Sequence, residues 1–153
     1  MPLINWYARE QLYRHMYEEC NRLEKKGRGD TIILFWKAAA AGMDDNTSEA
    51  ISGLHSLKGK SDASLAALSA LRYFLKVEGQ KTGRLDSAAL DEVNRDLPAA
   101  QGRSNNNAKI LAASFNYCVG DMAGAAGLLD PICENAMDMD APELTTWQKD
   151  ACR

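Results

Sequence analysis

The chain has 153 residues, the length of one ordinary domain, and 46% of them are hydrophobic, which is enough to bury a continuous core. The formal net charge of −3 disfavours a nucleic-acid-binding protein, because such proteins usually present a basic stripe. The N-terminus does not resemble a secretory signal, and no window approaches the roughly 18 consecutive apolar residues of a membrane-spanning helix. Four cysteines far apart in such a chain are expected to be reduced thiols.

Helix-forming residues dominate the chain, and short breaks rich in glycine and polar residues separate the helical stretches. Helix caps are expected at Asp62, at Asp86 and in the polar cluster at 104–107. Because short breaks make neighbouring helices fold back on each other, the helices are expected in antiparallel pairs. The predicted pairs are residues 3–9 with 12–25, 31–42 with 48–57, 63–77 with 85–97, and 108–119 with 122–136. A further helix at 142–153 is predicted to have no partner.

The second pair shows the clearest repeat pattern. Ala38 occupies the position where a tetratricopeptide repeat has a small residue in its first helix. Ala50, Leu54 and Leu57 follow at spacings that place them on one face of the next helix. Small residues are needed at such crossings because a larger side chain would push apart helix axes that pack about 8–10 Å from each other.

The other pairs follow this pattern less regularly. The fourth pair has Ala113 and Ala125 at its small sites, with a Gly-Asp turn between its helices. The third pair has a long predicted break at 78–84, and another break is predicted at 98–107. Pro131 lies inside the last predicted helix of the fourth pair, and we expect it to kink or end that helix.

This pattern predicts an all-α fold in which tetratricopeptide-type helical hairpins stack in a right-handed superhelix, or α-solenoid. Residues 1–153 would form one such domain, with about four helix pairs and an unpaired last helix, as the N-terminal fragment of a longer chain. An irregular helical bundle is the alternative.

The stretches LINWYAREQLYRHMYEEC, ILFWKAAAAGMDDNTSEAISGL and SLAALSALRYF resemble the N-terminal end of the tetratricopeptide repeat protein 21 family, also called the intraflagellar transport protein 139 family. The resemblance covers residues 3 to about 132, and LINWY and TSEAI are its most specific parts. Members of this family are the large repeat subunits of intraflagellar transport complex A. The resemblance implies a long superhelix that acts in retrograde transport in the cilium or flagellum, with complex subunits or cargo as partners.

No motif for catalysis or for a cofactor is visible. The sequence has no GxxxxGK[ST] loop, no GxGxxG and no HExxH, and its two histidines, His15 and His55, fall on different predicted helices. Cys20 and Cys118 are expected on core faces, where cysteine is unreactive. We therefore predict no enzyme, no cofactor, no metal site and no small-molecule substrate.

Repeat phase instead indicates a protein-binding surface. First helices line the concave face of such solenoids. The polar or aromatic residues that this phase assigns to the concave face are Asn5, Arg9, Asn107, Ser114 and Tyr117. The third pair has a less regular phase and contributes Arg72, Tyr73 and Lys76.

We therefore predict a non-catalytic scaffold of the cytoplasm and cilium that binds other proteins, with no nucleic acid and no insertion into membranes. The alternative is a repeat subunit or co-chaperone of another complex, such as a vesicle coat. A co-chaperone clamp for a peptide carboxylate needs lysines and asparagines, and its matching positions in the second pair are Phe35 and Ala39.

Overall fold

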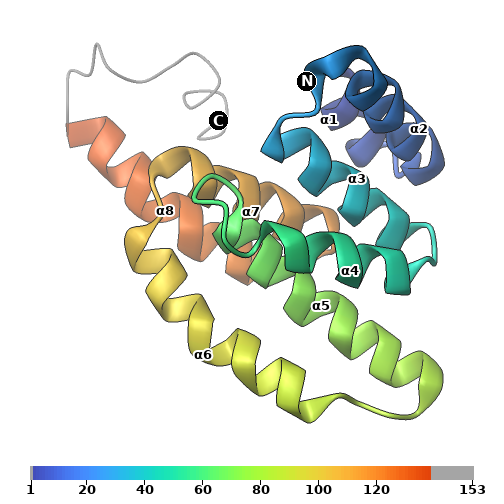
Figure 1. Ribbon diagram of the computed structural model, residues 1–153. Helices are drawn as coiled ribbons and strands as arrows, with labels where there is room; N and C mark the ends of the chain where they lie inside the picture. The colour runs from blue at the N-terminus through green and yellow to red at the C-terminus, as the bar shows by residue number, and fades with distance from the viewer. Residues whose placement is uncertain (1, 139–153) are drawn as a thin grey trace.

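The computed structural model describes residues 2–138, and every regular element in this range is helical (Figure 1). The helices are α1 (Pro2–Arg9), α2 (Tyr13–Leu23), α3 (Thr31–Met43), α4 (Thr47–Leu57), α5 (Ser64–Thr82), α6 (Ser87–Arg103), α7 (Asn106–Cys118) and α8 (Met122–Asp138), with a π-helical turn η1 (Glu24–Arg28) after α2. The predicted all-α fold of packed helical hairpins is confirmed. The helix predicted at 142–153 lies outside the described residues.

Short polar side chains begin five of the helices by accepting a hydrogen bond from a backbone N–H of the first turn. These capping residues are Asp30, Asn46, Asp86, Asn105 and Asp121. Asp86 and the 104–107 cluster were predicted as caps. Asp62, also predicted, does not cap, because α5 begins after Ala63 without a side-chain bond.

The helices of the third pair are longer than predicted. Helix α5 continues past Val77 to Thr82 and ends where Gly83 takes a left-handed φ of 69°, a conformation that glycine adopts without steric cost. Helix α6 passes through Pro98 to Arg103. The breaks predicted at 78–84 and 98–107 are therefore wrong in most of their length.

Pro131 does not end α8, which was predicted over 122–136 and continues to Asp138. A proline inside a helix removes one N–H donor and crowds the carbonyl four residues before it. Pro98 and Pro131 are both exposed, and so are Asn94 and Gly127, the residues whose carbonyls lose that donor. Water can reach these carbonyls, which reduces the cost of keeping the proline inside the helix.

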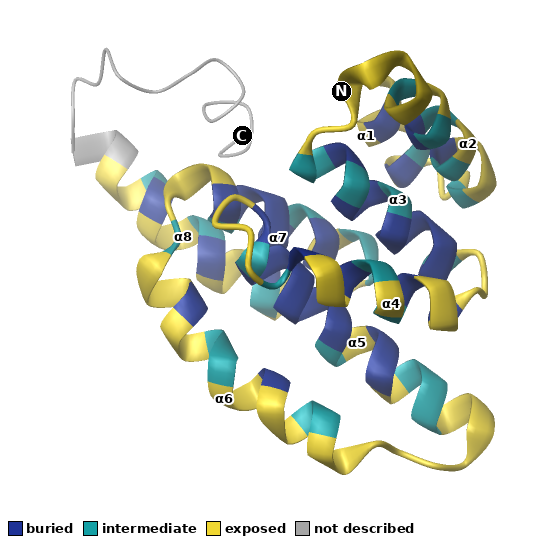
Figure 2. Cartoon of the chain, in the orientation of Figure 1, coloured by how far each residue is buried: buried dark blue, intermediate teal, exposed yellow. Residues whose placement is uncertain are grey.

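The helices pack in sequence, α2 on α3, α3 on α4 and α4 on α5, but α6 interrupts the series. It packs chiefly on α5, and α7 packs directly on α5 and α8. Only Val93 and Ala100 of α6 are buried, and most of its surface is exposed in Figure 2, whereas α3, α5 and α7 are largely buried. The third pair is therefore the irregular part of the stack.

Three phenylalanines join the first helices of successive pairs. Phe35 of α3, Phe74 of α5 and Phe115 of α7 are at most 1% exposed. The ring of Phe115 lies 5.9 Å from that of Phe35 and 5.8 Å from that of Phe74, within the range of favourable aromatic contacts. This cluster fixes the relative positions of α3, α5 and α7.

The expectation of reduced thiols holds for two cysteines of the described range. Cys20 and Cys118 are free, whereas Cys133 is disulfide-bonded, so the expectation is wrong for Cys133. Spacing along the sequence could not reveal this, because a disulfide depends on which thiols meet in space. Among the described helices, none combines the length and the apolar character that a membrane span would need.

Candidate functional site

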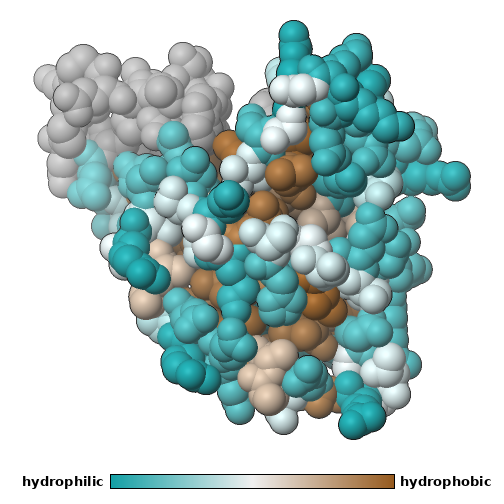
Figure 3. Space-filling model, in the orientation of Figure 1, coloured by the Kyte–Doolittle hydropathy of each residue, from teal (hydrophilic) through white to brown (hydrophobic). Residues whose placement is uncertain are grey.

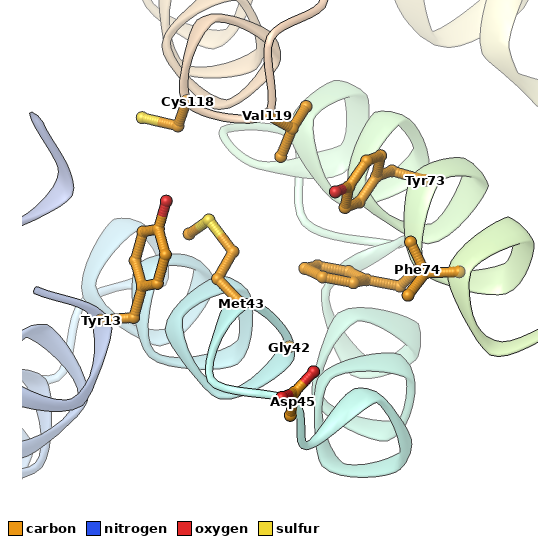
Figure 4. A pocket seen from close by; sticks show the side chains of 9 residues that line it. Tyr13, Gly42, Met43, Asp45, Tyr73, Phe74, Cys118 and Val119 are labelled. Carbon is orange, nitrogen blue, oxygen red and sulfur yellow. The ribbon is translucent and has the colours of Figure 1, made fainter. Parts of the chain in front are cut away.

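A cavity of about 240 Å³ lies where α3, α5 and α7 meet the start of α2 (Figure 4). We call it the tyrosine cavity. Its lining residues are Tyr13, Gly42, Met43, Asp45, Tyr73, Phe74, Val77, Cys118 and Val119. The side chains come from all four helical pairs and converge on one space, as Figure 4 shows. The cavity therefore depends on the stacking of the pairs rather than on any one of them.

Two tyrosines stand on opposite sides of the cavity. Tyr13 comes from the first turn of α2 and directs its hydroxyl toward the side on which Cys118 lies (Figure 4). Tyr73 comes from α5, and its ring packs edge-on against Phe74 with centroids 5.2 Å apart. Tyr73 is 37% exposed, so its ring is available to a bound molecule. Such aromatic side chains offer apolar area together with a hydrogen-bonding hydroxyl.

Burial raises the pKa of two side chains that line the cavity, Cys118 and Tyr13. Burial raises the pKa of the Cys118 thiol, so this side chain stays protonated at neutral pH and is a weak nucleophile. Burial is also the main cause that raises the pKa of the Tyr13 hydroxyl, with smaller contributions from Cys118 and Tyr73. At the rim, the carboxylate of Asp45 accepts a hydrogen bond from the Lys81 ammonium at 2.9 Å. This arrangement suits binding of an apolar or aromatic side chain.

The predicted site residues fall in several places. Tyr73 lines the tyrosine cavity. Tyr117 is not among its lining residues, although it precedes the lining residue Cys118 in the last turn of α7, and it is 59% exposed. Lys76 is exposed on α5, one turn beyond Tyr73. The hydroxyl of Ser114 donates to the Ile110 carbonyl at 2.8 Å, which satisfies it within α7.

The remaining predicted residues are not brought to this cavity. Asn5 and Arg9 are exposed on α1, and Asn107 lies in the first turn of α7, at the opposite end from Cys118. Arg72 lines a separate groove between α5, α6 and α8. Repeat phase thus grouped side chains that the fold distributes over more than one surface.

Sequence reasoning missed Tyr13, Met43, Cys118 and Val119 as lining residues. They lie at or beside helix ends, and the repeat pattern assigned none of them to a binding surface. Their only signal is that each is an apolar or aromatic residue beside a predicted turn. Apolar residues also gather in the middle of the face drawn in Figure 3, with hydrophilic residues around them. The exposed large apolar residues are Leu3, Trp6, Leu12, Tyr73, Leu85, Tyr117 and Met122.

Within residues 2–138, His, Cys, Asp and Glu side chains form no group of three or more that could hold a metal ion. The co-chaperone clamp positions, Phe35 and Ala39, are both fully buried, so neither can contact a peptide.

Comparison with known proteins identifies the family. Residues 4–149 match the model of the tetratricopeptide repeat protein 21 N-terminal ARM repeat. The chain is 26% identical over 146 residues to mouse tetratricopeptide repeat protein 21B. The aligned region covers 95% of the chain and 11% of the mouse protein. The chain is 32% identical over 75 residues to the human protein of the same name, and this aligned region covers 49% of the chain and 6% of the human protein. The chain thus spans only a small part of the length of its curated relatives. ARM and tetratricopeptide repeats are both stacks of helices in a superhelix, and the chain belongs to the tetratricopeptide repeat protein 21 N-terminal ARM repeat family.

Proposed function

We propose that this chain is a non-catalytic protein-interaction scaffold that serves in intraflagellar transport complex A, in retrograde transport within the cilium or flagellum. The observation that carries the proposal is the tyrosine cavity, which α3, α5 and α7 form with the start of α2 and in which the ring of Tyr73 is 37% exposed. Solenoids use surfaces of this kind for recognition. The complex and its location rest on family membership.

The chemistry of the cavity supports binding rather than catalysis. Its walls combine tyrosine rings with the apolar side chains of Met43, Phe74 and Val119, and its thiol stays protonated. Exposed aromatic residues at the edge of an apolar cavity are frequent anchors of protein interfaces. A partner would insert an apolar or aromatic side chain between Tyr13 and Tyr73, and Tyr117 would contact it from outside.

The test is co-purification with the subunits of complex A. The tagged 153-residue chain is incubated with extract from ciliated cells, and the retained proteins are identified by mass spectrometry. We expect complex A subunits or their cargo to be retained by the native chain and reduced at least about tenfold by the double change Tyr73→Ala and Tyr117→Ala, because aromatic anchors can contribute 2 kcal/mol or more.

Trp6→Ala is the matched control, since Trp6 is a similarly exposed aromatic residue on α1, away from the cavity. Retention that Trp6→Ala reduces and the tyrosine changes leave intact would contradict the site. Retention of a vesicle coat in place of complex A subunits would favour the alternative complex.

A further inference from the structure

A second groove lies on the side of α5 that α6 covers incompletely. Since α6 packs chiefly on α5 and not on α7 or α8, a cavity of about 400 Å³ remains among α5, α6, α7 and α8. We call it the amide groove. Its lining residues are Leu65, Ser69, Arg72, Asn94, Leu97, Pro98, Gln101, Asn116, Gly124, Gly127 and Leu128. Its size lies within the range of about 300–1,000 Å³ that is usual for ligand sites.

The polar lining of this groove is of two kinds. Asn94, Gln101 and Asn116 each bring a carboxamide, and Asn116 is only 5% exposed. A carboxamide both donates and accepts hydrogen bonds, and so does each peptide unit of an extended chain. Three carboxamides around one groove can therefore bind a peptide backbone without requiring a particular sequence. The side chains of Leu65, Leu97 and Leu128 add apolar surface to the same groove.

Among the lining residues that the structure describes, Arg72 is the only one with an ionised side chain. It is half-buried on α5 and forms no hydrogen bond or ion pair with any residue of the described range. The N-terminal turn of α8 adds no free positive charge, because the carboxylate of Asp121 already accepts the Gly124 N–H at 2.9 Å. The anion preference therefore rests on Arg72 alone: a guanidinium with no internal partner favours an anionic group, and a carboxylate fits its paired donors.

We propose that the amide groove binds an extended segment of a partner protein that places an Asp or Glu side chain against Arg72. This inference rests on the proposed function and adds a second surface with a defined partner chemistry. The partner backbone lies along the carboxamides, and its carboxylate pairs with the guanidinium. A nucleic acid is disfavoured, because a single cation cannot neutralise a run of phosphates.

Gly127 allows the groove to be blocked without disturbing the core. A Cβ atom added there meets no heavy atom within 4 Å, although the residue lines the groove. Gly127→Leu would therefore project a side chain into the groove and also favour the helix, because glycine is the poorer helix former. Gly102→Leu is the matched control, since Gly102 is an α6 glycine with equally open surroundings that does not line the groove.

The experiment uses a phage-displayed library of random peptides, selected on the 153-residue chain. We expect the enriched peptides to share an Asp or Glu residue. The affinity of the best peptide, measured by fluorescence anisotropy, should fall roughly tenfold or more in Arg72→Gln and in Gly127→Leu. It should stay within about twofold of the native value in Gly102→Leu and in Arg95→Gln, which removes an exposed α6 charge outside the lining.

Several outcomes would overturn the inference. Enriched peptides without a shared acidic residue would contradict the pairing with Arg72, and so would an affinity that Arg72→Gln leaves unchanged. Selective binding of an oligonucleotide in place of acidic peptides would do the same. Melting curves of all variants show whether each is folded, and side-chain amide shifts of Asn94 and Asn116 in NMR spectra place the bound peptide.

The same variants separate this inference from the proposed function. If no acidic peptide binds in the expected way while complex subunits are retained by the native chain and lost after the Tyr73 and Tyr117 changes, the amide groove is wrong and the scaffold proposal stands. If acidic peptides bind as expected and no complex subunit is retained by the native chain, the groove is supported and the transport proposal fails.

Discussion

The backbone of Gly42 lies directly against the ring of Phe74, so that a Cβ atom added to Gly42 would lie 2.5 Å from Cζ of that ring. The same atom would lie 2.8 Å from Cβ of Ala50. The contact brings together α3, α4 and α5 at the floor of the tyrosine cavity. It ties the packing of the second pair to the placement of the third.

Gly42→Ala should destabilise the chain by about 1–3 kcal/mol, because neither the Phe74 ring nor the Ala50 methyl group has room to move in a packed core. Chemical denaturation measures this difference. Gly102→Ala is the control, since it has open surroundings and should be neutral or stabilising by up to about 1 kcal/mol. Equal free energies of unfolding for native chain and Gly42→Ala would show that these helices are less tightly packed.

Ala50→Phe and Ala125→Phe should each cost on the order of 1–3 kcal/mol through overpacking. Ala50 is fully buried and Ala125 is 5% exposed, each in a second helix of its pair. The neighbouring Ala126 is exposed, so Ala126→Phe should melt within a few degrees of the native chain. Melting curves of the three variants give the comparison, and a native-like curve for Ala50→Phe would refute the tight crossing of α3 and α4.

Removing the Asn105 side chain should weaken the start of α7. Its side-chain oxygen accepts the Ala108 N–H at 2.9 Å, and loss of such a cap costs about 0.5–2 kcal/mol. Asn106→Ala changes the adjacent exposed asparagine, whose side chain does not cap the helix, and should have a much smaller effect. Urea denaturation of both variants is the measurement. Equal losses of stability would show that the cap contributes nothing.

Stability should fall at high pH because of Cys20. Burial is the main cause that raises the pKa of its thiol to about 12, from the ordinary value of 9.0. The folded chain therefore keeps this proton where the unfolded chain loses it, and the stabilisation that is complete below pH 9 decreases as the pH rises towards 12. Denaturation of the native chain and of Cys20→Ala across this range tests it. The variant should lose less stability with pH, and parallel curves would contradict the assignment to Cys20.

The tyrosine cavity should tolerate changes at its edge. Tyr117 is 59% exposed, so Tyr117→Ala should change the melting temperature by no more than a few degrees while weakening partner capture. Tyr13→Phe removes only a hydroxyl and should keep the ring that forms the opposite wall. Differential scanning calorimetry and the capture assay together separate folding from binding. A large loss of stability in Tyr117→Ala would mean that its ring is structural.

The local pattern of the sequence was sufficient for the helices and for much of the core. Glycine-rich breaks, capping residues and the spacing of Ala50, Leu54 and Leu57 depend on neighbours within a few turns, and all three of these apolar residues are buried. The resemblance to the repeat family was confirmed by the family match. Pro98 misled the prediction, because a proline is tolerated inside a helix when its surroundings are exposed, and exposure is not a local property of the sequence.

Only the tertiary structure decided where the cavities lie. Tyr73 and Arg72 are adjacent in the chain, yet successive side chains on a helix point about 100° apart, and the packing of α7 and α6 on different sides of α5 directs one to each cavity. Tyr13 and Val119 are more than a hundred positions apart and line the same space. The sequence alone determined most of the helical segments and their apolar faces, because those properties are periodic. The amide groove depends on how α6 departs from the regular stack, and that departure results from packing between helices.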